Sequence, residues 1–174
     1  MIPSMHTWTA GRRIPKSDRE GTVIRGAGGP DAKQASIIWQ FSGEMQSVHW
    51  RPAHVVLAGR GNEIYAFDEE TLELKYYLDT GFGFQRFLTP PGRDRVIVLG
   101  TVGLCVLTSE PKELWRVEEL RTEEALEFEG FHEQRFTLKG KQRPADEWTM
   151  MEFDLESGPV ARRKKGGPGA PRTE

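Results

Sequence analysis

The sequence predicts an all-β protein made of about three four-stranded antiparallel sheets. Three observations support this fold class. The 174 residues include 19 glycines and 11 prolines, too many for a helical bundle. Short β-branched or aromatic runs end in glycine, as buried strands do before turns. These runs also recur with a period near 40 residues, which is typical of a repeat architecture.

The repeat is visible in the strands that end in glycine. VVLAG at residues 55–59 recurs as VIVLG at 96–100 and as FTLKG at 136–140. Each unit continues with a second strand at 63–68, 104–108 or 149–154, and polar turns follow at 68–71, 109–112 and 154–158. Third strands are predicted at 72–78 and 113–117, and the first strands of the units at 46–51, 83–88 and 126–131.

Two further segments belong to this pattern. Residues 36–41 have the same aromatic character and are interpreted as the third strand of an earlier, incomplete unit. Residues 118–127 are rich in helix formers and could form a helical turn between two units. We therefore expect helix to be confined to one or two turns.

A four-stranded sheet buries both faces only by stacking against similar sheets, which is the physical basis of a β-propeller. Propellers usually close with four to eight sheets, or blades, whereas this chain has about three. The terminal sheets would expose apolar surface, so the sequence predicts that a homodimer, a protein partner or the N-terminal segment completes the ring. A dimer of two-fold symmetry is the expectation for the isolated protein.

The segment GNEIYAFDEET at residues 61–71 resembles the blade signature of quinoprotein-type (PQQ-like, WD40-like) β-propellers. In that family a glycine-led turn precedes a strand that ends at an aspartate, and an outer strand bears a tryptophan. Trp39 and Trp115 stand where this tryptophan would fall, with Tyr76 or Tyr77 in the unit between them. The resemblance covers residues 36–160 and implies the blade fold. It does not extend to the quinone cofactor site, so no cofactor is expected.

Charge divides the chain into three parts. Residues 1–33 carry a net charge of +3 and are predicted to be a loose segment in which only 22–25 could pair as a strand. Residues 34–160 form the predicted repeat domain, where acidic groups predominate. Residues 161–174 are predicted to be a disordered basic tail. No apolar run reaches the roughly 18 residues of a membrane helix and no signal-peptide core is evident, so a cytoplasmic location is expected.

Few residues indicate catalysis or metal binding. Cys105 lies between Leu104 and Val106 and is predicted to be a buried packing thiol. His49 and His54 lack partners at ligand spacing, so no metal site is expected. Asp68 and Asp154 are predicted to cap hairpin turns through side-chain hydrogen bonds. No catalytic residues are assigned.

Aromatic residues indicate a candidate surface for binding a partner. Phe82, Phe84 and Arg86 alternate with other residues and are expected on one side of a strand, either as packing between blades or as an anchor for a partner. Loops before the inner strands and after the glycine-ended strands should emerge on one face. The predicted partner-binding residues are Arg60, Asn62, Phe82, Phe84, Arg86, Glu123, Glu124, Arg143 and Asp146.

Three functions are compatible with these features. The favoured one is a non-enzymatic protein-interaction module, such as a scaffold or one of the small acidic bacterial proteins that neutralise toxins. The second is a hydrolase or oxidoreductase whose site is assembled at an oligomer junction. The third is binding of an anionic polymer through the basic tails, although the acidic body makes nucleic acid an unfavourable partner.

Overall fold

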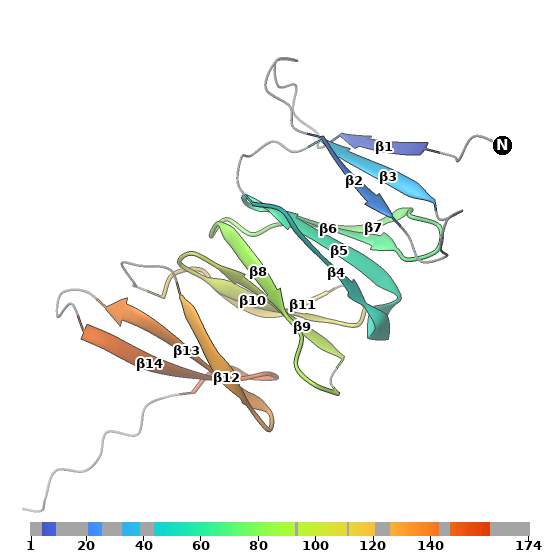
Figure 1. Cartoon of the computed structure of the whole chain (residues 1–174). Coiled ribbons are helices and arrows are strands. Elements are labelled where there is room, and N and C mark those ends of the chain that lie inside the picture. The colour runs from blue at the N-terminus through green and yellow to red at the C-terminus, as the bar shows by residue number, and fades with distance from the viewer. Residues whose placement is uncertain are drawn as a thin grey trace, which may run out of the picture.

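The computed structural model describes residues 5–9, 21–25, 33–38, 44–92, 94–110, 112–120, 126–142 and 147–160. Within these ranges the chain is built of strands, and the one helical element is the 3-10 turn η2 (Arg51–Ala53). The strands form one three-stranded sheet and three four-stranded antiparallel sheets, stacked along the molecule (Figure 1). The predicted all-β fold class and its three four-stranded sheets are thus confirmed.

The strands follow one another in chain order within the four-stranded sheets. The second sheet contains β4 (Gln46–Trp50), β5 (Val55–Arg60), β6 (Glu63–Asp68) and β7 (Leu74–Asp79). The third contains β8 (Phe84–Leu88), β9 (Arg95–Gly100), β10 (Leu104–Thr108) and β11 (Glu113–Val117). The fourth contains β12 (Glu127–His132), β13 (Arg135–Gln142), β14 (Glu147–Asp154) and the short β15 (Gly158–Pro159). Every strand predicted for these sheets lies within two residues of its expected bounds.

The N-terminal sheet differs from the prediction. It contains β1 (Met5–Thr9), β2 (Gly21–Arg25) and β3 (Gln34–Ile38), with β3 in the middle. The strand β2 matches the segment expected to pair, but β1 lies in the part of the chain expected to be loose and runs parallel to β3. Trp39, placed in an outer strand by the sequence pattern, lies outside the described residues.

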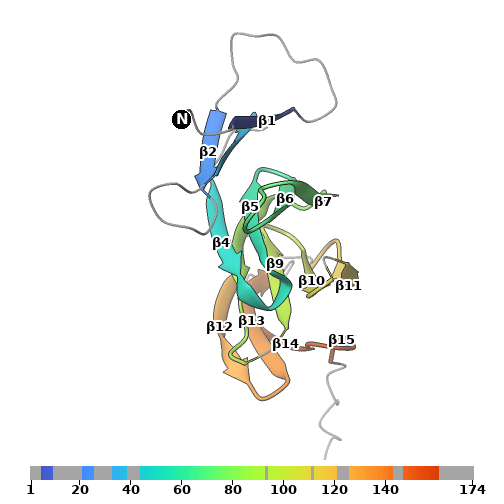
Figure 2. The same ribbon diagram turned by 90° about the vertical axis from the view of Figure 1, so that its right-hand side faces the viewer.

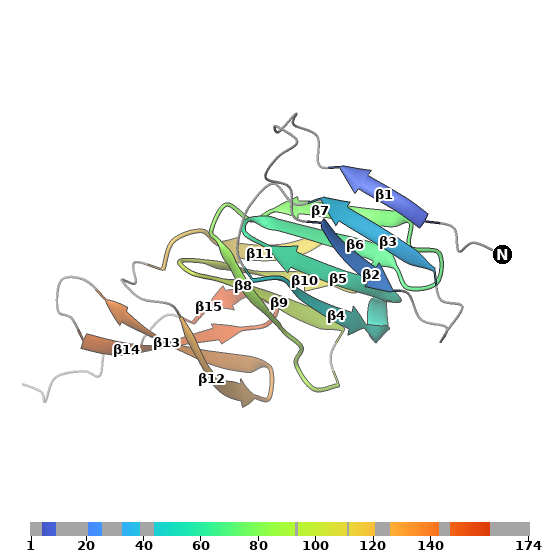
Figure 3. The ribbon, with the colours of Figure 1, turned by 45° about the horizontal axis from the view of Figure 1, so that its top comes forward.

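Apolar side chains between neighbouring sheets hold the stack together. Ile37 of β3 is buried against Val56, Tyr65 and Phe67 of the second sheet, and Figure 3 shows the N-terminal sheet lying over that sheet. Two further apolar clusters fill the second–third and third–fourth junctions. The first strands β4 and β12 lie on one side of the stack, and β7, β11 and β15 lie on the other (Figure 2). This is the strand arrangement expected for adjacent blades.

The two middle sheets and the fourth sheet bury their faces differently. Every residue of β5 is buried, and so are the last five residues of β9, because a sheet packs on each side of these strands. In β14 the side chains alternate, with Phe153 buried and Trp148 and Met150 exposed. Arg135, Lys139 and Glu152 lie on the same outward side as Trp148 and Met150, so the outer face of the fourth sheet is mainly polar with two exposed apolar side chains.

The β-bulges recur at equivalent positions in different sheets. In the outer strands, Lys75 and Leu114 are each skipped in the pairing, which marks a β-bulge at the same place in two sheets. In the first strands, Gln85 and Glu129 are skipped in the same way. These bulges turn the edges of the sheets and change which face the following side chain occupies.

Among the residues that the structure describes, no helix is long and apolar enough to cross a membrane.

Candidate functional site

The predicted partner-binding residues that the structure describes gather where β5 turns into β6 and where the linker enters β8. Asn62 fixes this region, because its side-chain Oδ1 accepts a hydrogen bond from the Gly83 N–H at 2.9 Å. Its main-chain carbonyl accepts another from the Thr80 N–H at 2.8 Å. Asn62 therefore holds the linker between two sheets.

Phe82 and Phe84 are packing residues. They are 2% and 8% exposed and belong to the apolar cluster between the second and third sheets. The guanidinium of Arg116 lies 5.9 Å from the centre of the Phe82 ring, and Arg116 itself is bound to Glu113. Arg60 is also buried, at 7% exposed. These placements match the interpretation as packing between blades, and they leave little of either phenyl ring for a partner.

Arg86 lies on the opposite face of the sheet from Phe84, so the expectation that Phe82, Phe84 and Arg86 share one side was wrong. Phe84 pairs with Gly100 and Arg86 pairs with Leu99, since the bulge at Gln85 inserts one residue. Adjacent residues of a strand point to opposite faces, so Arg86 follows Leu99 toward the fourth sheet. Simple alternation along the sequence does not reveal a bulge.

A pocket of about 420 Å³ lies beside Arg86 at the beginning of the first strands, and we call it the inner-edge pocket. Phe84 and Leu126 supply apolar lining, and Leu126 is 3% exposed. Polar lining comes from Glu44, Gln85 and Arg86. In the part of the chain that the structure describes, Arg86 makes no ion pair. The sequence analysis missed Glu44 and Leu126, for which their place just before β4 and β12 was the only signal.

The remaining predicted partner-binding residues, Glu123, Glu124, Arg143 and Asp146, lie outside the described residues. Their grouping with Arg60 and Asn62 stays a prediction. The topology agrees with the expected common face, since the Leu120 N–H donates to the Val102 carbonyl at 2.7 Å, as Thr80 does to Asn62. The linkers and the glycine-ended strands thus meet on one side of the stack, where β5 and β9 end.

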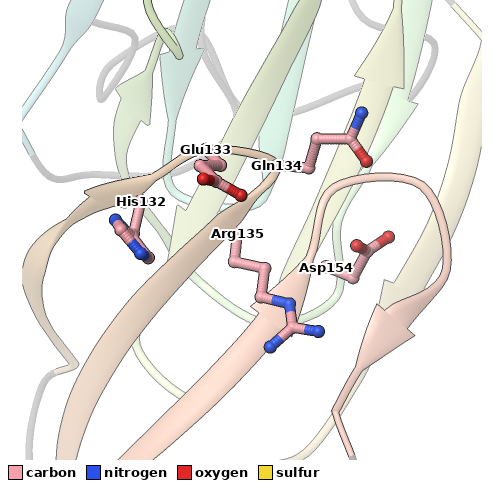
Figure 4. A pocket seen from close by; sticks show the side chains of 5 residues that line it. All are labelled: His132, Glu133, Gln134, Arg135 and Asp154. Atoms are coloured by element: carbon pink, nitrogen blue, oxygen red, sulfur yellow. The ribbon is translucent and has the colours of Figure 1, made fainter.

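A second pocket, of about 650 Å³, lies at the opposite ends of the strands, where β12 turns into β13 (Figure 4). Its lining side chains come from residues 132–135 and from Asp154, and His132 lies away from Gln134 and Asp154. Arg135 is bound to Glu152 at 2.9 Å, and Asp154 accepts the N–H groups of Glu156 and Ser157. Arg135 and Asp154 are therefore already bound to neighbouring residues.

The two turn aspartates make the predicted hydrogen bonds. Oδ1 of Asp68 accepts the main-chain N–H groups of Glu70 and Thr71, and Oδ1 of Asp154 accepts those of Glu156 and Ser157. The Lys75 ammonium, 2.8 Å from Asp68, and these N–H groups hold the pKa of the Asp68 carboxyl well below its usual range. Hydrogen bonds from Ser157 lower the pKa of Asp154. Both aspartates have a structural role in hairpin turns.

Replacing Asp68 by asparagine is expected to lower the free energy of unfolding at pH 7 by about 1 kcal/mol. The native pKa lies below the ordinary value of 3.8, so the carboxylate stabilises the fold above about pH 4. That contribution is lost as the pH falls toward the native pKa. The variant has no carboxylate at this position, so its free energy of unfolding should fall less between about pH 4 and pH 3 than that of the wild type. Urea unfolding between pH 3 and 7 measures it, with exposed Glu70→Gln as control. Parallel pH profiles for wild type and D68N would contradict the assignment.

Cys105 is buried as predicted, and burial raises the pKa of its thiol to about 12. His54 is bound to Glu69 through Nδ1 at 2.7 Å, and His49 is exposed on β4. Among the described residues, no three His, Cys, Asp or Glu side chains are grouped to hold a metal ion.

A scan against protein-family models and a search of curated proteins each found no match. The likeness to quinoprotein-type propeller blades therefore stays a resemblance carried by the sequence repeat.

Proposed function

We propose that this chain is a non-enzymatic protein-interaction module with propeller-like sheets, and that its partner binds along the inner-edge pocket. One observation carries the proposal. Arg86 has no ion pair among the described residues, and it lines a pocket with Glu44 and Gln85, in which the neighbouring Phe84 and Leu126 are almost fully buried. Arginine is one of the residue types enriched among those that dominate the energetics of protein interfaces.

The chemistry of the pocket indicates what the partner offers. The planar guanidinium of Arg86 favours a carboxylate, which it can bind through two hydrogen bonds. Glu44 disfavours a second acidic group at its side of the pocket. We infer that the partner presents one acidic side chain or a C-terminal carboxylate. A scaffold or a toxin-neutralising protein would use such a contact.

Comparative capture tests this function. Tagged wild type, Arg86→Ala and Arg86→Lys are incubated with lysate of the source organism, and bound proteins are quantified by mass spectrometry. Arg135→Ala is the matched control, because that arginine is exposed and lies at the opposite ends of the strands. A partner whose binding falls about tenfold with Arg86→Ala, but not with the control, supports the proposal. The same proteins captured equally by all variants would contradict it.

Self-association of the chain stays a prediction, and the exposed apolar residues that could support it are few. The N-terminal sheet covers one face of the second sheet, and the outer face of the fourth sheet is mainly polar. On that face Trp148 and Met150 are 44% and 48% exposed, and Lys139 lies 4.6 Å from the centre of the Trp148 ring. Multi-angle light scattering decides the matter, since a dimer has twice the 19.7 kDa mass of the chain. A monodisperse species at the single-chain mass would reject the dimer.

A further inference from the structure

A third pocket lies at the junction of the second and third sheets. It is at the opposite ends of the strands from the inner-edge pocket, where β4 ends and β8 turns into β9. It has a volume of about 550 Å³, and we call it the sheet-junction pocket. Residues 48–52 of β4 and η2 form one wall, and the turn between β8 and β9 forms the other through Thr89, Pro90, Gly92 and Asp94. The volume falls in the range of pockets that bind small molecules.

Trp50 lines this pocket and carries an unusual polar group. The residue is 2% exposed, and its indole Nε1 is buried without a hydrogen-bond acceptor among the described residues. Buried donors in folded proteins are nearly always satisfied, because a donor without an acceptor costs about 1–3 kcal/mol. The same residue lines the sheet-junction pocket. An unsatisfied N–H at this position favours a ligand that carries an acceptor.

The charged residues around the pocket indicate the charge of that ligand. Asp94 is engaged by Arg95 at 2.6 Å, and its other oxygen accepts the Ser109 hydroxyl at 3.4 Å. Arg51 is exposed and makes no ion pair in the described part of the chain. Arg95 also pairs with Glu156 at 3.1 Å, so the Asp94 carboxylate shares its cation with a second acid. Arg51 is thus the cation of the pocket lining that has no ion pair among the described residues, and His49 beside it adds a second nitrogen donor.

We propose that the sheet-junction pocket binds a small apolar organic anion, such as an aromatic carboxylic acid. The apolar body packs against Val48, Pro52 and Pro90, the acid group pairs with Arg51, and an acid oxygen accepts the Trp50 N–H. Nε1 is out of contact with solvent, so the proposal requires the pocket walls to move outward when the ligand binds. This site is independent of the partner contact proposed at Arg86.

A matched pair of dyes tests the proposal. 8-Anilinonaphthalene-1-sulfonate has an aromatic body and an anionic group, and N-phenyl-1-naphthylamine is the same body without the sulfonate. Fluorescence titration of the full chain should give saturable binding of the anionic dye at one site, and at least about tenfold weaker binding of the neutral dye. 4-Phenylbutyrate should displace the anionic dye, and 4-phenylbutan-1-ol should not. Equal affinity for the two dyes, or no saturable binding, would overturn the proposal.

Variants place the dye in this pocket. Arg51→Ala should weaken binding of the anionic dye about tenfold and leave binding of the neutral dye unchanged. Lys112→Ala, in the exposed turn between β10 and β11, should change neither. Trp50→Phe keeps the ring and removes the donor, so it should weaken the anionic dye about fivefold. Its melting temperature and near-ultraviolet circular dichroism report whether the core is intact. Unchanged binding in both Arg51→Ala and a folded Trp50→Phe would overturn the proposal.

Discussion

Gly100→Ala is expected to lower the free energy of unfolding by about 3 kcal/mol, one of the two largest single-residue effects that we predict. A Cβ atom at Gly100 would lie 2.7 Å from the carbonyl oxygens of both Phe82 and Gly83, and would overlap the ring of Phe82. Main-chain atoms cannot move aside cheaply, because the same linker is hydrogen-bonded to Asn62. The strain therefore remains in the folded state.

Two other glycines make this a graded test. At Gly59 the added Cβ would meet the Phe84 ring at 2.7 Å and the Ile64 side chain at 2.8 Å, so side-chain movement relieves part of the strain. At Gly130 nothing lies within 4 Å, and alanine there should leave stability unchanged within about 0.5 kcal/mol. Urea unfolding should show the largest loss of stability for Gly100→Ala, a smaller loss for Gly59→Ala and the smallest for Gly130→Ala. Equal effects at 100 and 130 would refute the packing assignment.

The recurring glycines show what the sequence could and could not reveal. Their spacing located the buried strands β5 and β9 to within one residue. The expected reason was a turn, but the structure shows close contact of Gly59 with Phe84 of β8 and of Gly100 with Phe82 of the linker before β8. A repeat records that a position is constrained, and the packing that constrains it comes from residues distant in sequence.

The candidate site was predictable only in part, for two physical reasons. Single-residue bulges carry no strong sequence signal, so the face occupied by Arg86 was assigned wrongly. The burial of Phe82 and Phe84 depends on the third sheet stacking on the second, which a local pattern does not report. The aspartate turns at Asp68 and Asp154 were predictable because their hydrogen bonds are made within three residues.

The terminal sheets show a similar limit. The period of 40 residues identified a fourth sheet but did not distinguish an interior position from an end position. Alternation in β14, with Trp148 and Met150 outside and Phe153 inside, does distinguish them. The parallel pairing of β1 with β3 has no counterpart in the repeat and had no signal of its own.

Trp115→Ala is the second change expected to have a large effect, with a loss of about 3 kcal/mol in the free energy of unfolding. The indole stacks on Phe136 and Phe153 of the fourth sheet, with ring centres 6.3 and 6.2 Å away. Its Nε1 donates a hydrogen bond to the Leu155 carbonyl at 3.0 Å. The outer-strand tryptophan that the propeller resemblance placed here thus joins the third sheet to the fourth.

The matched variants separate the two contributions of this side chain. Trp115→Phe keeps an aromatic ring but removes the donor and part of the stacked area, so it should cost at least about 1 kcal/mol and less than Trp115→Ala. Leu114→Ala, on the exposed side of the same strand, should cost less than about 0.5 kcal/mol. Because Trp115 acts at one junction, hydrogen exchange in Trp115→Ala should accelerate in β12, β13 and β14 and stay near wild type in β4 and β5. Uniform acceleration in all sheets would contradict a local role. In that case the stack would unfold as one cooperative unit, and the loss of one junction would be shared by every sheet.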